Sequence, residues 1–143
     1  MDISTKRYHD IRSKALKCKK LFRTSNPVAI ARGLGINYSV LPLNSIEGFA
    51  TEDQHGHCSI FISDKYNSYQ RRILCAHELG HIILHSEDEL NCFDRDEGPT
   101  SPVITEYEAD LFAIELMPFI AARIDYTALN AQELHQYIKS LLY

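Results

Sequence analysis

The sequence contains no apolar run that approaches the ~20 consecutive residues of a membrane-spanning helix. Its first residues also lack the continuous apolar stretch of a signal peptide, because Asp2, Lys6 and Arg7 interrupt them. Internal repeats and low-complexity segments are absent as well. These features argue against a membrane, secreted or repeat protein, and we expect the chain to be cytoplasmic.

Cysteine is scarce, and no two cysteines form the C-x-x-C pair of a zinc ribbon or of a thioredoxin-type redox site. The four are widely separated: Cys18, Cys58, Cys75 and Cys92. In a cytoplasmic chain we expect them to be reduced thiols. Cys75 lies between two apolar residues, which favours a small buried side chain over a metal ligand.

The 143 residues are 45% hydrophobic and 24% charged, which is typical of a globular protein with one core. The net charge of −4 is unevenly distributed, since residues 1–35 hold nine of the fifteen Lys and Arg but two of the nineteen Asp and Glu. The beginning of the chain is therefore basic and the remainder acidic. We predict one domain that spans residues 1–143.

An amphipathic helix is predicted for residues 4–22, where apolar residues recur at steps of three and four. These residues are Tyr8, Ile11, Ala15, Cys18 and Phe22. Lys and Arg cover the other faces, as a solvated exterior or as a contact surface for an acidic partner or for phosphates. Since no recognition-helix pattern is present, we do not expect direct binding of nucleic acid.

Residues 26–63 predict a short helix followed by a small antiparallel or mixed sheet. Asn26 suits the cap of the helix and Pro27 its first turn. Three segments have the pattern of strands: 36–41, 46–51 and 57–63. His55 and His57, in the turn before the last strand, are interpreted as exposed polar residues because no further ligands accompany them.

The most informative stretch is a predicted helix over residues 68–85 that contains the pattern H-E-x-x-H. Residues four apart lie on one face of a helix, so His77 and His81 can bind one metal ion while Glu78 acts as a base toward water. In a chain of this composition the pattern is expected by chance roughly 0.02 times. Because the helix is apolar nearly all round, we expect it to be buried.

A catalytic zinc ion usually has three protein ligands, so a third is required. His85 lies about 12 Å along the helix from His77, too far for both to bind one ion. We expect it near the carbonyl groups at the end of the helix.

The next predicted helix, residues 105–117, offers a better third ligand in Glu106. Asp110 lies on the same face and could accept a hydrogen bond from a ligand histidine. Glu108 is rotated away and is expected to face solvent. As an alternative, Glu106 and Asp110 could form a solvated acidic edge.

Two further segments complete the chain. Residues 86–102 contain six acidic residues, Gly98, Pro99 and Pro102, and predict a long loop. A loop of this length is either functional or an ordinary connection, and both interpretations remain open. A last helix is predicted for residues 130–143.

Two stretches resemble the ImmA/IrrE metallopeptidases. One runs from Gln70 to His85, and the other runs from Glu106 to Ala113 and is followed by Leu116-Met117-Pro118. The resemblance covers about residues 26–118 and implies a gluzincin-like core in an α+β fold. It also implies a zinc site with His77, His81 and Glu106 as ligands and Glu78 as the catalytic base.

The resemblance further implies a substrate, namely a helix-turn-helix repressor encoded by the same prophage or mobile element. We divide the chain into a basic helix in 1–25, a family core in 26–118 and a helical segment in 119–143. The short segment after Pro118 favours the compact mobile-element type. The alternative functions are a metal-stabilised module that sequesters a repressor without cleaving it, and a purely structural polar cluster without metal.

Overall fold

The computed structural model describes residues 3–85 and 102–143. Over these two ranges the chain forms α-helices, strands and two short 3-10 turns. In chain order they are α1 (Thr5–Phe22), α2 (Pro27–Gly33), β1 (Asn37–Leu41), β2 (Gly48–Glu52), β3 (Cys58–Ser63), α3 (Ser68–Leu84), α5 (Pro102–Leu116), η1 (Pro118–Ala121), η2 (Tyr126–Ala128) and α6 (Ala131–Ser140). The predicted α+β class is confirmed. The acidic segment that predicts a loop lies, up to residue 101, outside the described residues.

The three strands form a mixed sheet in the order β1-β3-β2. β1 runs parallel to β3 and β2 runs antiparallel to it, so that β2 is an edge strand. Ile60 and Ile62 of β3 are fully buried, because alternate residues of a strand point to the same face. In the turn after β2, Oδ1 of Asp53 accepts hydrogen bonds from the backbone N–H groups of His55 and His57. Both histidines are exposed, as expected.

Side-chain caps determine where α3 and α6 begin. Oδ1 of Asn67 accepts a hydrogen bond from the N–H of Gln70, whose side chain accepts one from the N–H of Asn67. Asn130 and Glu133 form the same reciprocal pair at the start of α6. The predicted starts of both helices are confirmed, whereas α6 ends at Ser140, earlier than predicted.

α5 extends further toward the amino terminus than predicted. It begins at Pro102, whereas the sequence predicts a helix from Thr105. Proline suits the first turn of a helix, because an N–H group would have no intrahelical partner there. At its other end α5 stops at Leu116, and Pro118 opens the turn η1, which confirms the predicted stop.

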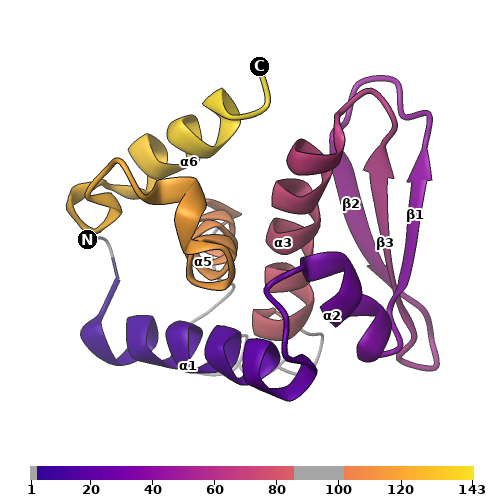
Figure 1. Ribbon diagram of the computed structural model, residues 1–143, viewed down its shortest axis with the longest axis horizontal. Helices are drawn as coiled ribbons and strands as arrows, with labels where there is room; N and C mark the ends of the chain where they lie inside the picture. The colour runs from indigo at the N-terminus through magenta and orange to yellow at the C-terminus, as the bar shows by residue number, and fades with distance from the viewer. Residues whose placement is uncertain (1–2, 86–101) are drawn as a thin grey trace.

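α3 lies at the centre of the fold, between the sheet on one side and α5 with α6 on the other (Figure 1). Its contact with α5 is close because position 80 is a glycine. A Cβ atom on Gly80 would lie 3.1 Å from Cβ of Phe112 and 3.2 Å from Cα of Ala109. This approach brings the carboxylates on either side of Ala109 next to the histidines of α3.

Gly80→Ala should destabilise the protein, although alanine is the better helix former. The gain in helix propensity is about 1 kcal/mol, whereas an additional methyl group in a packed core costs about 1–3 kcal/mol. We expect a net loss of about 1 kcal/mol in the free energy of unfolding, measured by urea denaturation of chelator-treated protein. A denaturation midpoint equal to or above that of the wild type would contradict this expectation, because the gain in helix propensity would then match or exceed the cost of the added methyl group.

α1 packs along α5 through the predicted apolar stripe, of which Ile11 and Ala15 are fully buried. A buried carboxylate strengthens this contact. Glu115 of α5 accepts hydrogen bonds from the hydroxyl groups of Tyr8 and Tyr126, both at 2.7 Å. No helix in the described part of the chain is long and apolar enough to cross a membrane.

Candidate metal centre and catalytic site

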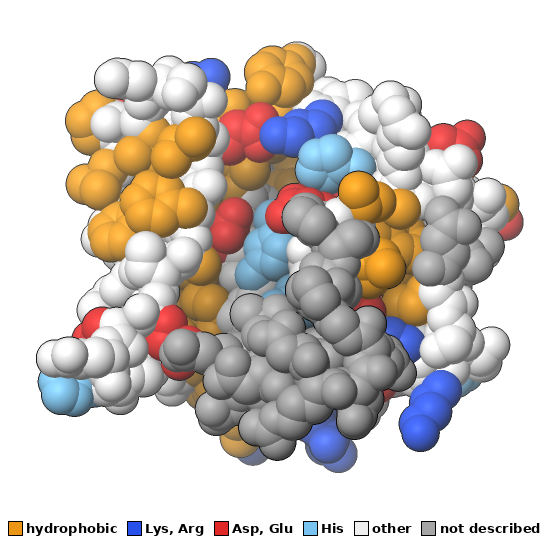
Figure 2. Space-filling view, turned by 180° about the vertical axis from the view of Figure 1, so that it is seen from behind, with side chains coloured by type: hydrophobic (Ala, Val, Ile, Leu, Met, Phe, Trp, Pro, Cys, Tyr) orange, Lys and Arg blue, Asp and Glu red, His pale blue; other side chains and the backbone are white. Residues whose placement is uncertain are grey.

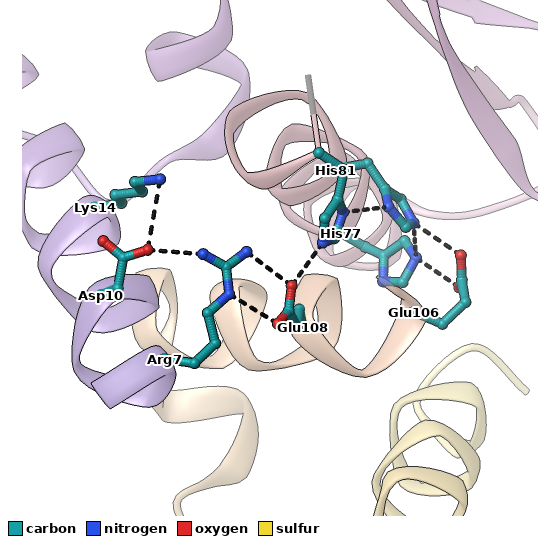
Figure 3. Close-up of polar contacts among 8 residues, drawn as sticks. Arg7, Asp10, Lys14, His77, His81, Glu106 and Glu108 are labelled. Atoms are coloured by element: carbon teal, nitrogen blue, oxygen red, sulfur yellow. Dashed lines mark hydrogen bonds and ion pairs between the residues drawn. The ribbon is translucent and has the colours of Figure 1, made fainter. Parts of the chain in front are cut away.

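Three side chains from two helices converge on one point: His77 and His81 of α3 and Glu106 of α5. The two Nε2 atoms of the histidines lie 3.1 Å apart. The carboxylate of Glu106 approaches both, with Oε1 2.8 Å from Nε2 of His81 and Oε2 3.0 Å from Nε2 of His77. One donor atom of each residue lies within 4.8 Å of the other two. The structure thus brings together the three ligands that the sequence proposes (Figure 3).

These donors fit a tetrahedral zinc ion. Two imidazole nitrogens bound at about 2.0–2.1 Å from one ion lie about 3.3 Å apart, close to the observed separation of 3.1 Å. Two histidines and one carboxylate, with a fourth position for water, form the ligand set of many catalytic zinc sites. The chemistry and the spacing of the residues therefore agree with a divalent metal.

The second ring nitrogen of each of these two histidines is also held by a polar contact. Nδ1 of His77 lies 2.8 Å from Oδ1 of Asp110, which is fully buried. Oδ2 of Asp110 accepts a hydrogen bond from Nδ1 of His135 on α6, at 3.0 Å. On the other side, Nδ1 of His81 lies 3.2 Å from Nδ1 of His85. Such contacts orient the rings so that their Nε2 atoms face the common point.

The carboxylates of Asp110 and Glu106, of which only the first is fully buried, make this site favourable for positive charge. Burial opposes a charge on His77, but its hydrogen bonds to Asp110 and Glu106 outweigh burial and raise the pKa of His77 to about 10. Burial raises the pKa of Glu106 and of Asp110, yet the adjacent histidines outweigh it and lower both pKa values. A proton on His77 supplies the positive charge when no metal is bound, and a divalent cation can replace it.

Glu78 follows His77 in α3 and lines a cavity of about 320 Å³ between α3, the segment that leads into β2, and α6. Burial raises the pKa of Glu78, although His77 and His81 oppose the shift. Figure 2 shows a hollow in which acidic and histidine side chains gather between hydrophobic ones. A carboxylate with a raised pKa in such a cavity is suited to accepting a proton and returning it.

Two walls of the cavity are joined by an ion pair. Glu47 precedes β2, Lys139 belongs to α6, and both line the cavity. Nζ of Lys139 donates a hydrogen bond to Oε1 of Glu47, which also accepts one from the hydroxyl group of Tyr143. The pair therefore connects the sheet side of the cavity with the carboxy-terminal helix.

The expectation that Glu108 faces solvent is wrong, since the residue is 6% exposed. Its carboxylate accepts hydrogen bonds from Nε2 of His85, at 2.8 Å, and from the guanidinium of Arg7 on α1. Burial favours the neutral acid, but these bonds outweigh it and lower the pKa of Glu108 to about 2. Helical spacing alone does not show that α1 covers this side of α5. His85 caps the end of α3, as expected, but it also contacts this carboxylate.

His135 also lines the cavity, although no role is predicted for it from the sequence. The one signal is its spacing, because His135 precedes the buried Ile138 by three residues and shares its helix face. From the sequence, five other side chains could donate a hydrogen bond to the carbonyl oxygen of a substrate. None of them is among the described residues that line this cavity. They are His55, His57, Tyr66, Tyr69 and Tyr107.

Comparison with known proteins decides the family. Residues 31–139 match the model of a peptidase family described as the IrrE N-terminal-like domain. The chain belongs to this family. This IrrE-like domain is also 34% identical over 113 residues to "Uncharacterized immunity region protein 2" of Bacillus phage phi105. The alignment covers 77% of the chain and 69% of the phage protein.

Membership in this family confirms the resemblance drawn from the motifs and gives the IrrE-like domain a metallopeptidase-type function with a protein as substrate. The matched residues include His77, Glu78, His81 and Glu106 and most of α6. They begin at residue 31, within α2, so that α1 lies outside the match.

Metal binding to this domain should release protons. At pH 8 a histidine with a pKa of about 10 is protonated, and a metal binds the neutral ring. We expect close to one proton released per divalent cation, and an affinity that rises with pH up to the pKa of His77, about tenfold per pH unit. Calorimetric titration in two buffers of different ionisation enthalpy measures the proton count, and a count of zero at pH 8 would contradict the raised pKa.

Proposed function

We propose that this IrrE-like domain is a zinc-dependent endopeptidase that acts in the cytoplasm on one specific protein, a helix-turn-helix repressor of a prophage or mobile element. The observation that carries the proposal is the convergence of His77, His81 and Glu106 beside Glu78, in a chain of a metallopeptidase family. The relative from phage phi105 is named for an immunity region, which supports a substrate from a phage or similar element.

In this proposal His77, His81 and Glu106 hold the ion, and Asp110 orients His77 through its Nδ1. When bound, zinc supplies a Lewis acid that polarises a carbonyl group and lowers the pKa of water. Glu78 accepts the proton of the attacking water and passes it to the leaving amine. Its raised pKa suits both transfers, because the carboxylate binds the proton long enough to deliver it.

His135 is the residue that we assign to the developing negative charge on the carbonyl oxygen. Its Nδ1 is occupied by Asp110, so that Nε2 is the nitrogen available to donate a hydrogen bond when the ring is protonated. The hydrogen bond to Asp110 raises the pKa of His135, despite the opposing effect of burial. In its protonated form His135, which lines the same cavity as Glu78, stabilises an oxyanion more than it stabilises a neutral carbonyl.

The outer edge of β2 offers a place for the substrate backbone. In the described residues β2 pairs with β3 alone, so that its other edge can accept a further strand. Gly48 at one end of β2 lines the cavity together with Glu78. Ala50 and Thr51 line a second depression together with His81. A polypeptide paired with β2 would therefore run past the ligand cluster.

His135→Gln should lower the rate of cleavage by about 10²–10³-fold, the effect of removing one donor to an oxyanion. The affinity for zinc should fall by less, since glutamine can still donate a hydrogen bond to Asp110. Single-turnover cleavage and a zinc titration of the same preparation separate the two effects. Equal losses in both would assign His135 to the support of Asp110 instead.

The proposal is tested by incubating the purified zinc-loaded chain with the repressors encoded beside its gene and identifying the products by mass spectrometry. We expect two fragments from a single bond in one repressor, and none after treatment with a chelator. If the repressor is bound but stays intact, the chain is a sequestering module and the proposed activity is wrong.

A further inference from the structure

Arg7 of α1 makes a two-pronged ion pair with Glu108 of α5 (Figure 3). Nε of Arg7 donates to Oε2 of Glu108 and Nη2 donates to Oε1, both at 2.8 Å. The side chains are 22% and 8% exposed, so that water screens the pair only in part. The remaining nitrogen of the guanidinium, Nη1, donates to Asp10 at 2.7 Å. Every nitrogen of Arg7 is therefore engaged, and the geometry of the Glu108 carboxylate is fixed.

The hydrogen bonds from this carboxylate lead directly to the proposed metal site. When Nε2 of His81 faces the metal, its Nδ1 carries the proton and donates to Nδ1 of His85. His85 then carries its own proton on Nε2 and donates it to Oε1 of Glu108, at 2.8 Å. The positions of the protons are therefore consistent along the whole series of hydrogen bonds, from His81 through His85 and Glu108 to Arg7. His77, in contrast, donates to the carboxylate of Asp110 without an intervening ring.

We propose that Arg7 is a positioning residue of the metal centre, which holds His81 in its ligand orientation through Glu108 and His85. This inference rests on the proposed metal site and adds a part of the chain that lies outside the residues matched by the family model. It makes the docking of α1 a condition for tight metal binding. The basic amino-terminal helix thereby acquires a role that neither its charge nor its apolar stripe indicates.

The contact between α1 and α5 does not depend on Arg7 alone. Ile11 and Ala15 are fully buried in it. Arg12 also pairs with a carboxylate of α5, with its Nε 3.8 Å from Oε2 of Glu115. Arg12 thus provides a matched control, because it is an arginine of the same helix that contacts the same partner helix. Within the described residues, however, the carboxylate of Glu115 accepts hydrogen bonds from Tyr8 and Tyr126 and none from a histidine of α3.

The experiment compares metal binding by the full chain and by the variants Arg7→Met, Arg7→Lys and Arg12→Met. Zinc affinity is measured by competition with a chromophoric chelator, and the ligand geometry by the visible absorption of the Co²⁺-loaded protein. We expect Arg7→Met to lower zinc affinity about tenfold and to alter the Co²⁺ spectrum, as for other residues that support a ligand histidine. Arg7→Lys keeps the positive charge but cannot donate two parallel hydrogen bonds to Glu108, so that its zinc affinity should fall less than that of Arg7→Met. The zinc affinity and the Co²⁺ spectrum of Arg12→Met should match those of the wild type.

A double-mutant cycle with His85→Phe distinguishes positioning from general stabilisation. If Arg7 acts through His85, Arg7→Met should change zinc affinity less than twofold in the His85→Phe background. The same tenfold loss in that background would overturn the proposal, and so would a wild-type affinity and spectrum for Arg7→Met. If Arg7→Met fails to fold by circular dichroism, the Co²⁺ spectrum of Arg7→Lys decides, an unchanged spectrum counting against the proposal. Failure of the wild type to bind either metal would instead refute the proposed metal site.

Discussion

Glu78→Gln is expected to abolish cleavage of the repressor while one zinc ion per chain remains bound. Glutamine has nearly the same shape as glutamate but cannot accept a proton, so that the ligands stay in place and only the acid–base step is lost. General acid–base catalysis contributes about 10²–10⁴-fold to a rate, and we expect a loss in this range. Co-expression of the repressor with the wild type or with Glu78→Gln, followed by immunoblotting for fragments, measures it.

The same variant separates the two functions considered from the sequence. Glu78 is no ligand of the proposed site, and its side chain makes no hydrogen bond in the described part of the structure. A protein that sequesters its partner should therefore relieve repression equally well with glutamine at this position. Cleavage at the wild-type rate by Glu78→Gln would exclude the proposed base, and relief of repression without fragments would favour sequestration.

Glu106→Ala is expected to remove the bound metal without unfolding the chain. Glu106 is the one anionic ligand of the proposed site, and its side chain is 42% exposed, so that its loss leaves no hole in the core. The affinity for zinc should fall by more than the roughly 10–100-fold seen when only a supporting residue is changed. Metal analysis of protein after dialysis should give a zinc content near one per chain for the wild type and near zero for the variant.

Glu52→Ala serves as the control for Glu106→Ala, because Glu52 is an exposed acid of β2 that is absent from the ligand cluster. It should retain its zinc. Circular dichroism of Glu106→Ala should match that of metal-free wild type. Retention of zinc by Glu106→Ala would show that another group is the third ligand, and Asp110→Ala would then be the next variant to examine.

Much of the fold was predictable because the signals are local. Asn67 with Gln70 and Asn130 with Glu133 each carry the cap of a helix within four residues, and both helix starts are confirmed. The alternating residues around Ile60 likewise predict the central strand without knowledge of its partners. Strand order is a different matter, because the parallel pairing of β1 with β3 depends on the connection through β2 and not on either strand's own sequence.

The candidate site likewise has parts that local sequence patterns predict and parts that they do not. His77 and His81 are one helical turn apart, and Glu106 belongs to a motif on the next helix, so that spacing and resemblance together suggest the cluster. Arg7 is 101 residues away from the carboxylate that it holds, and His135 is 25 residues away from Asp110. Neither contact leaves a periodic pattern in the sequence, because each depends on how two distant helices pack.

The ion pair between Glu47 and Lys139 determines how the cavity can admit a polypeptide. A chain that enters between the sheet side and α6 has to separate these two side chains, which are 19% and 39% exposed. A pair that water reaches to this extent contributes about 0.2–1 kcal/mol, so that opening it reduces the population of the accessible form by about fivefold at most. Such a weak closure cannot select one protein among many. The selectivity of the proposed peptidase must therefore come from contacts other than the opening of this pair.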